Sequence, residues 1–249
     1  MANSILYKYR SCDSRSISML ENRELYFSDP KHFNDPVDCK INIFSALKAA
    51  VELAENEDST VRNKLEQLGK LDDLFKKIEN GVKNAGVYSL TREQNNVLMW
   101  SHYADKHKGF SVGFDFSSSI TEYNEENQIV GTEDVYYSED NPFVEYFLSI
   151  CKAPKLPPWE EFWPSIFSMG LVAKSYAWKY ENEVRVIRGN AGIVTYSPDD
   201  LKEMIFGLEI ETKKRNDIEN ILSGSEFTHV QMKKIVREYD GFKLRIENC

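Results

Sequence analysis

The chain has 249 residues, of which 41% are hydrophobic and 12% aromatic, and its formal net charge is -9. This apolar content is enough for a sizeable core and excludes bulk disorder. Because phosphate binding needs concentrated Lys and Arg, an acidic chain is a poor non-specific nucleic-acid binder, although the segments KHKG (106–109) and KKIVR (233–237) leave room for a local basic site.

The first third of the chain begins with a predicted strand, a short helix and a second strand, at residues 6–10, 17–20 and 24–28. The turn residues of Asp29-Pro30 and Asn34-Asp35-Pro36 follow. From about 41 to 83 the leucines recur at helical spacing with charges on the other face. We therefore expect an inserted helical pair at 41–83.

The remainder mixes helices with short strands. Alternating Phe and Val over 109–116 predict a half-buried strand. We expect further strands at 87–90, 129–137 (after an acidic loop), 183–188, 193–196, 204–206, 227–231 and 242–246. We expect helices at 95–104, 143–151, 160–173 and 214–222. Since strands and helices do not alternate regularly, the pattern favours one α+β domain over residues 1–249, with a mixed and mostly antiparallel sheet.

Three features indicate a cytoplasmic protein. No apolar run reaches the roughly 18 residues of a membrane span. The first ten residues lack a basic region followed by a long apolar stretch, so we expect neither a secretory signal nor a membrane partner. Cys12, Cys39, Cys151 and Cys249 are widely separated, and we expect reduced thiols without a disulfide or zinc.

The segment NNVLMWSHYADKHKG (95–109) contains candidate site residues at the end of a predicted helix. For Trp100 the alternative interpretation is a packed aromatic face. His102 and Tyr103 lie near a likely sheet edge, which favours a site. His102 and His107 are five residues apart, whereas two metal ligands on one helix face want a spacing of four, so we expect no metal here.

The segment FNDPVD (33–38) follows a strand and a turn. Its Asn, Asp and Pro residues are typical of turns, in which the polar side chains bond to nearby backbone amides. The functional alternative is a loop with polar groups at the rim of a site. We expect His102 and Tyr103 to line the same cleft as this loop.

The segment WKYENEVR (178–185) has the form W-x-x-E-x-E-x-R. On a strand, Glu181, Glu183 and Arg185 would share one face. Such a row is either ordinary surface or, given its aromatic flank, part of a pocket. In a pocket, the two carboxylates could perform acid–base work or stabilise a developing positive charge.

Two further candidates end the first two predicted strands. Arg10 follows Tyr7 and Tyr9, and Ser28 follows Tyr26 and Phe27. Alone, they are typical of a surface salt bridge and of a cap. The chain contains no P-loop, G-x-G-x-x-G or G-x-S-x-G motif.

Four segments together resemble a bacterial family of unknown function, DUF2971. They are LYKYRS (6–11), LYFSDPKHFNDPVD (25–38), MWSHYADKHKGF (99–110) and WKYENEVRVI (178–187). The order of Arg10, Ser28 and the pair Glu181 and Glu183 also resembles that of ADP-ribosyltransferases. Two features depart from that family: its Ser-Thr-Ser is Phe27-Ser28-Asp29 here, and the helical insertion is not typical.

The second resemblance implies an ADP-ribosyltransferase-like fold that uses NAD as substrate. Arg10 would hold the NAD phosphates and ribose, and Ser28 would support the nicotinamide side. Glu183 would stabilise the oxocarbenium-like transition state with help from Glu181, because a fixed carboxylate stabilises developing positive charge. The cofactor-binding residues would be Arg10, Tyr26, Ser28, Asn34, His102 and Tyr103.

Three functions remain open at this point. The first is an NAD-dependent ADP-ribosyltransferase, as a toxin or phage-defence effector, that modifies an unidentified nucleic acid or protein. The second is a non-catalytic domain of the same fold that senses a nucleotide or protein. The third is a hydrolase that uses His102 with Glu183. Convergence of Arg10, Ser28 and Glu183 around one cleft would favour the first.

Overall fold

The computed structural model describes residues 5–40, 42–54, 59–116 and 128–249. It is an α+β structure with a mostly antiparallel sheet, as predicted. The acidic loop before residue 129 and Ile41 lie outside the described residues. The chain divides into two compact units, which we call the sheet unit (1–27, 87–134 and 180–249) and the helical unit (28–86 and 135–179).

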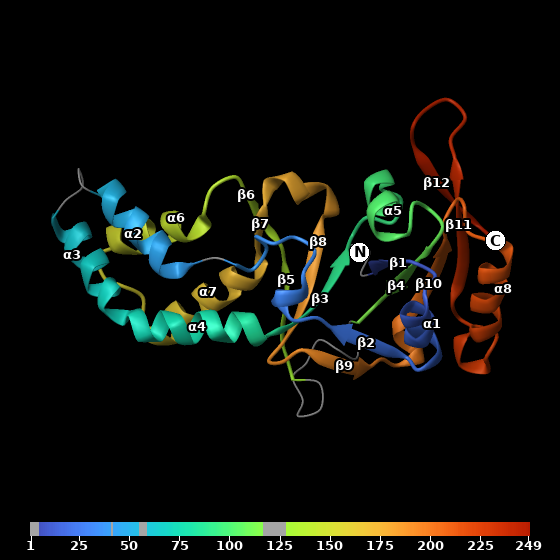
Figure 1. The fold of residues 1–249 in the computed structure, drawn as a ribbon, viewed down its shortest axis with the longest axis horizontal. Coiled ribbons are helices and arrows are strands. Elements are labelled where there is room, and N and C mark those ends of the chain that lie inside the picture. Colours follow the sequence, from blue (N-terminus) through green and yellow to red (C-terminus); the bar gives the residue numbers. More distant parts are fainter. Residues whose placement is uncertain (1–4, 41, 55–58, 117–127) are drawn as a thin grey trace. The chain divides into compact units, whose positions relative to one another are not determined.

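The sheet unit is built on eight strands in the order β12-β11-β10-β4-β1-β3-β8-β5 (Figure 1). Strand β1 pairs antiparallel with both β3 and β4, whereas β10 and β11 run parallel. The strands are β1 (Leu6–Arg10), β3 (Gly86–Thr91), β4 (Phe110–Phe114), β5 (Ile129–Asp134), β8 (Glu183–Arg188), β10 (Leu201–Phe206), β11 (Gln231–Arg237) and β12 (Leu244–Asn248).

Each face of this sheet carries its own hydrophobic cluster. We call the face that carries Phe110, Val112 and Phe114 of β4 the front face, and the opposite face the back face. The front face packs against helices and a small sheet. Those elements are α1 (Ser14–Glu21), α8 (Thr212–Ile221), β2 (Glu24–Phe27) and β9 (Gly192–Thr195).

The back face is covered by the short helix α5 (Val97–Tyr103). Its Trp100 is fully buried and makes an edge contact with Tyr9 of β1, with ring centroids 4.9 Å apart. The packed interpretation of Trp100 is therefore confirmed. Asn96 caps the helix, because its side chain accepts hydrogen bonds from the backbone amides of Leu98 and Met99.

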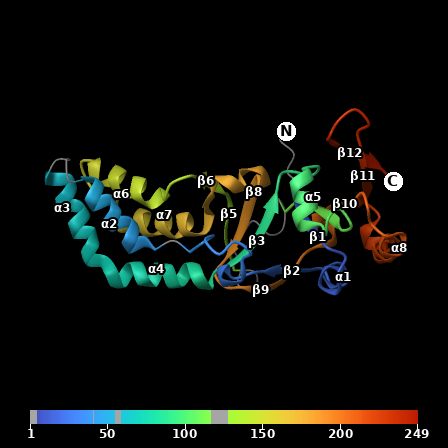
Figure 2. The ribbon, with the colours of Figure 1, turned by 45° about the horizontal axis from the view of Figure 1, so that its top comes forward.

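The helical unit contains five α-helices among its described residues and has a separate hydrophobic core. Helix α6 packs against α2 and α3, and α7 packs against α4 (Figures 1 and 2). The elements are α2 (Ile43–Leu53), α3 (Ser59–Leu68), α4 (Asp72–Asn84), β6 (Tyr136–Ser138), α6 (Pro142–Lys152), α7 (Trp159–Val172) and β7 (Ala173–Ser175).

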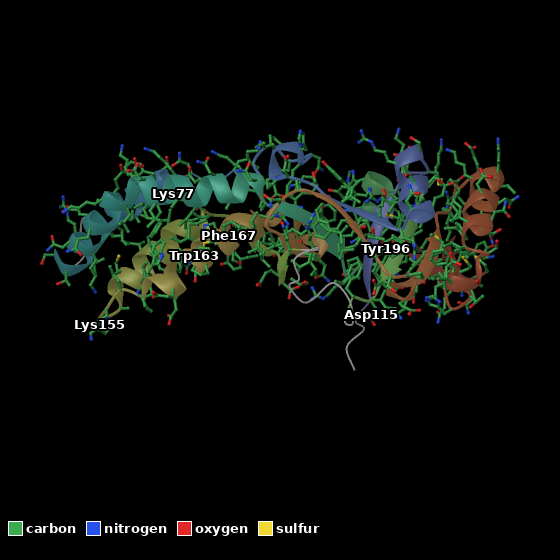
Figure 3. All side chains as sticks on the ribbon, turned by 90° about the horizontal axis from the view of Figure 1, so that it is seen from below. Lys77, Asp115, Lys155, Trp163, Phe167 and Tyr196 are labelled. Carbon is green, nitrogen blue, oxygen red and sulfur yellow. The ribbon has the colours of Figure 1, made fainter. Side chains whose placement is uncertain are left out.

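Small residues allow α4 and α7 to approach closely. A Cβ added at Gly170 of α7 would lie 2.9 Å from Cγ2 of Val82, and one at Gly81 of α4 would lie 3.2 Å from Cε2 of Phe167. Phe167 also contacts the ring of Trp163, one turn earlier on α7 (Figure 3). Because van der Waals attraction needs such close contact, the two glycines favour this helix pairing.

Three sequence predictions need correction. The segment 41–83 forms three helices rather than a pair, since Gly69–Leu71 adopts a 3-10 turn between α3 and α4. The single strand expected at 129–137 is two strands that belong to different sheets, β5 and β6. The strand expected at 227–231 is mostly a turn that follows the 3-10 segment Ser225–Phe227, and the next strand begins at Gln231.

The helices at 41–83 belong to a larger unit that also includes residues 135–179. That the whole chain forms one domain stays a prediction. No disulfide joins Cys12, Cys39, Cys151 and Cys249, all of which lie within the described residues. No helix within the described residues has the length and apolar composition to cross a bilayer.

Candidate functional site

The candidate residues of the sequence fall into both units. Arg10, Tyr26, His102, Tyr103, Glu181 and Glu183 belong to the sheet unit, whereas Ser28 and Asn34 belong to the helical unit. The Oγ of Ser28 donates a hydrogen bond to the carbonyl of Asp29 at 3.3 Å. That Ser28 and Asn34 join the others in one cleft therefore stays a prediction.

The segment 33–38 shows the turn chemistry expected of its residue types. The carboxylate of Asp35 is buried and accepts a hydrogen bond from the backbone amide of Val37 at 2.9 Å. Asp38 is also buried and forms an ion pair with Lys174, with 3.8 Å between Oδ2 and Nζ. The turn interpretation is confirmed for Asp35, and Asn34 is exposed.

Glu183 is held in a two-point ion pair on β8. Its Oε1 accepts a hydrogen bond from Nε of Arg185 at 2.8 Å, and its Oε2 accepts one from Nη2 at 3.2 Å. Both side chains are buried, and Arg185 is 0% exposed. A buried guanidinium and a carboxylate need each other, because either charge alone would be costly to desolvate. This contact accounts for Glu183 as a structural partner of Arg185.

Glu181 lies in the 3-10 turn Tyr176–Glu181 that precedes β8, not on the strand. Its Oε1 accepts a hydrogen bond from Oη of Tyr103 at 2.6 Å, and its carbonyl accepts one from Thr91. Between the two glutamates, Asn182 has φ +44°. The expectation that Glu181 and Glu183 lie on one strand is therefore wrong, because the chain is not extended between them.

Arg10 and Glu183 leave the sheet on opposite faces. Arg10 has the parity of Leu6, which packs against the front-face cluster. On β8, Val184 and Val186 share one parity and Glu183 has the other, and Val186 belongs to that same front-face cluster. Since side chains alternate along a strand, Glu183 and Arg185 point to the back face. The expectation that Arg10 and Glu183 meet in one cleft is therefore wrong.

On the front face, Arg10 lies beside the buried Tyr88, and Tyr88 in turn lies near the buried Tyr196. The pairing of Tyr7 with Thr91 places Arg10 opposite Tyr88 when the antiparallel register is continued. Within the described residues, three buried polar atoms have no hydrogen-bond partner in this region: Nε of Arg10 and the Oη atoms of Tyr88 and Tyr196. Buried polar groups are normally paired, so this region offers polar atoms that could bind an external oxygen.

Further positive charge lies close to these groups. The Nζ of Lys8 is 4.9 Å from the ring centroid of Tyr88, and the guanidinium of Arg188 is 5.4 Å from that of Phe27. The rings of Phe27 and Tyr88 are themselves 5.5 Å apart. Burial lowers the pKa of Arg188, although an arginine still carries its charge at neutral pH.

Burial also keeps the two tyrosines protonated. It raises the pKa of Tyr88, which the charge of Arg10 and a hydrogen bond with its guanidinium oppose, and it raises the pKa of Tyr196. Both hydroxyls can therefore donate hydrogen bonds at neutral pH. A protonated tyrosine beside a guanidinium supplies hydrogen-bond donors that suit an anionic oxygen. We call Lys8, Arg10, Tyr88, Arg188 and Tyr196 the front-face cluster of cations and hydroxyls.

Sequence reasoning found only Arg10 of this group. Tyr88 and Tyr196 occupy positions that fit buried strand and core residues, and the buried Arg188 is the last residue of β8. Only the strand register shows that Tyr88 lies opposite Arg10. Conversely, His102 is exposed, with its ring 6.3 Å from those of Tyr103 and Tyr180 on the other side of the sheet.

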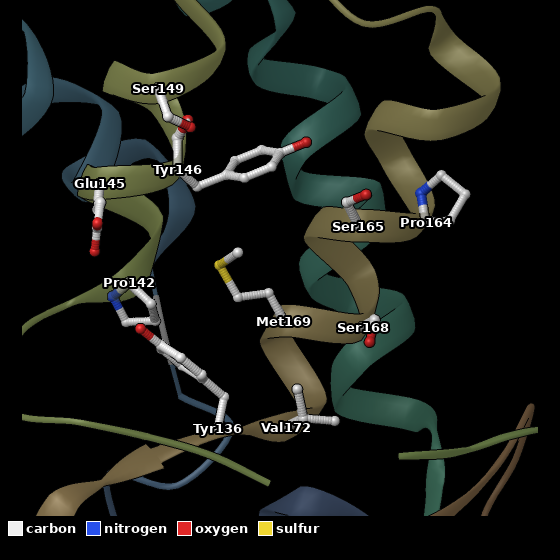
Figure 4. Close-up of a pocket in the computed structure, with 10 residues that line it drawn as sticks. All are labelled: Tyr136, Pro142, Glu145, Tyr146, Ser149, Pro164, Ser165, Ser168, Met169 and Val172. Carbon is white, nitrogen blue, oxygen red and sulfur yellow. The ribbon is translucent and has the colours of Figure 1, made fainter. Parts of the chain in front are cut away.

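The helical unit contains a separate hollow between α6 and α7 (Figure 4). Its volume is about 630 Å³, which is in the range of small-molecule pockets. Tyr146 points across it toward Ser165, and Met169 and Val172 form its apolar side. None of the residues that line it was a candidate from the sequence. Within the described ranges, no three His, Cys, Asp or Glu side chains gather as metal ligands.

The comparisons with known proteins concern the segment that contains Tyr103, Glu181 and Glu183. No curated protein and no solved structure matches the chain. The segments LYKYRS and LYFSDPKHFNDPVD precede the matched residues. Residues 99–186, from the middle of α5 to the centre of β8, match the family described as a protein of unknown function (DUF2971).

Proposed function

We propose that the chain is a non-catalytic nucleotide-binding domain that takes NAD or a related nucleotide on the front face of its sheet. The observation that supports this most directly is the buried Nε of Arg10, which has no hydrogen-bond partner among the described residues, beside the buried hydroxyl of Tyr88. A guanidinium with a neighbouring hydroxyl matches the oxygens of a phosphate. Arg10 is half-buried, so part of its side chain remains accessible.

Glu181 and Glu183 both already bind other side chains, which supports a binding role for the domain over a catalytic one. Glu183 is neutralised by Arg185, and Glu181 receives the hydroxyl of Tyr103. A carboxylate that stabilises a positive transition state must face the ribose, and here Glu183 lies across the sheet from Arg10. Transfer of ADP-ribose, which the resemblance implies, stays a prediction and requires that Glu183 be released from Arg185.

Isothermal titration calorimetry with several ligands tests the proposal. We expect NAD, ADP-ribose and AMP to bind the full chain, because each carries a phosphate, and we expect nicotinamide alone not to bind. Arg92→Ala removes an exposed arginine of the same unit and serves as the control that keeps binding. Equal binding of nicotinamide and NAD, or no binding of any phosphate-bearing ligand, would refute phosphate recognition at Arg10.

A further inference from the structure

The hairpin of β11 and β12 ends in two fully exposed aromatic side chains. Tyr239 and Phe242 have relative exposures of 105% and 100%, whereas the next most exposed large hydrophobic residue in the described ranges, Val37, has 66%. Both views show the loop between the two strands projecting beyond the body of the sheet unit (Figures 1 and 2). Two bare rings on a projecting loop are unfavourable in water unless a partner covers them.

The same hairpin is the basic part of an acidic chain. Residues 231–245 contain five Lys and Arg against two Asp and Glu, although the whole chain has a net charge of -9. The KKIVR segment supplies three of these cations. Positive charge is therefore concentrated where the two rings are exposed, although an acidic chain as a whole repels phosphate.

Most of these cations remain within reach of an external partner. Arg237 and Glu209 approach to 3.8 Å with side chains 74% and 58% exposed, and Lys234 and Glu247 to 3.9 Å. Exposed ion pairs of this kind are weak and exchange readily for other charges. Lys243 has no ion pair within the described part of the chain, whereas Lys233 is committed to the largely buried Glu203 at 2.6 Å.

We propose that this hairpin binds single-stranded nucleic acid. Bases of an unpaired strand stack on exposed aromatic rings, and the adjacent Lys and Arg contact the phosphates. A duplex keeps its bases stacked on one another and offers no free faces to Tyr239 and Phe242. Insertion into a lipid bilayer is disfavoured, because Glu238 and Asp240 flank Tyr239 and would have to enter with it.

Fluorescence anisotropy of a labelled oligo(dT) strand, titrated with the full chain, tests this proposal. The wild-type chain should bind the strand and should bind a duplex of the same length more weakly. The double variant Tyr239→Ala/Phe242→Ala should weaken binding by roughly tenfold or more, since each stacked base contributes that order of affinity. The variant Lys243→Glu should also weaken binding and reduce its salt dependence.

The matched control is Tyr136→Ala, which removes an aromatic side chain of 52% exposure from the helical unit. It should bind oligo(dT) like the wild type. Absence of binding, equal affinity for strand and duplex, or unchanged affinity of the double variant would each overturn the proposal. The result is independent of nucleotide binding at Arg10, which the double variant should retain.

Discussion

Glu183 and Arg185, two residues apart on β8, form a buried two-point ion pair with N–O distances of 2.8 and 3.2 Å. Their side chains are 5% and 1% exposed. The pair lies on the back face of the sheet, whereas Arg10 faces the front. This separation is the main reason for assigning Glu183 to structure and Arg10 to ligand binding.

Breaking this pair should destabilise the fold strongly. Arg185→Met leaves the carboxylate of Glu183 buried without its partner and should lower the free energy of unfolding by about 3–5 kcal/mol. The double variant Glu183→Gln/Arg185→Met should recover much of the loss. Urea denaturation measures both. As a control, Arg62→Met breaks an exposed pair with Glu66 and should cost less than about 1 kcal/mol. Equal effects of Arg185→Met and Arg62→Met would contradict the structural assignment.

The hydrogen bond from Tyr103 to Glu181 should also contribute to stability. Tyr103→Phe removes the donor from a buried carboxylate and should lower the free energy of unfolding by about 1.5–3 kcal/mol, the range for hydrogen bonds to charged groups. Tyr136→Phe, on an exposed side chain, should change it by less than about 0.5 kcal/mol. A Tyr103→Phe chain as stable as the wild type would show that this contact does not hold α5 to the segment before β8.

Tyr88→Phe should separate ligand binding from folding. Because Oη of Tyr88 is buried and makes at most a poorly aligned hydrogen bond with the guanidinium of Arg10, its removal should change the stability of the free chain little. The same substitution should weaken NAD binding by roughly tenfold, as expected for one hydrogen bond to a charged group. Thermal unfolding with and without NAD gives both quantities. A marked loss of stability without ligand would mean that the hydroxyl already has a partner.

Stability should decrease on acidification partly because of His107. Burial lowers the pKa of His107, and Arg237 acts in the same direction while Glu209 opposes it. Because the folded pKa lies below the unfolded one, the contribution to stability is full above about pH 6.5 and is lost as the pH falls through the folded pKa. Urea midpoints of wild type and His107→Gln at neutral and mildly acidic pH measure this. His107→Gln should lose less stability, and an identical loss would exclude His107 as a cause.

The sequence predicted the helices and strands better than it predicted how their side chains are oriented relative to one another. The helix at Trp100 and the strand at Phe110–Phe114 follow from periodicity, which is a local property. The orientation of Glu181 depends on the left-handed backbone of Asn182, which periodicity does not reveal.

The front-face cluster of cations and hydroxyls could not be predicted without knowing how the strands pair. Tyr88 lies 78 residues after Arg10 in the chain and faces it only through the register of β1 with β3. A single sequence without that register cannot show which strands are neighbours or which parity faces which layer. For the same reason, the order of Arg10 and Glu183 in the sequence suggested one cleft, while the sheet places them on opposite faces.

The measurement that tests the central claim most directly compares Arg10→Ala with Glu183→Gln in NAD binding by isothermal titration calorimetry. Folding of both variants is first checked by circular dichroism. If the nucleotide binds on the front face, Arg10→Ala should weaken NAD binding by roughly tenfold to a hundredfold, since it removes a charged contact to phosphate, and folded Glu183→Gln should bind like the wild type. Wild-type affinity in Arg10→Ala together with lost affinity in a folded Glu183→Gln chain would contradict the account and place the nucleotide on the back face.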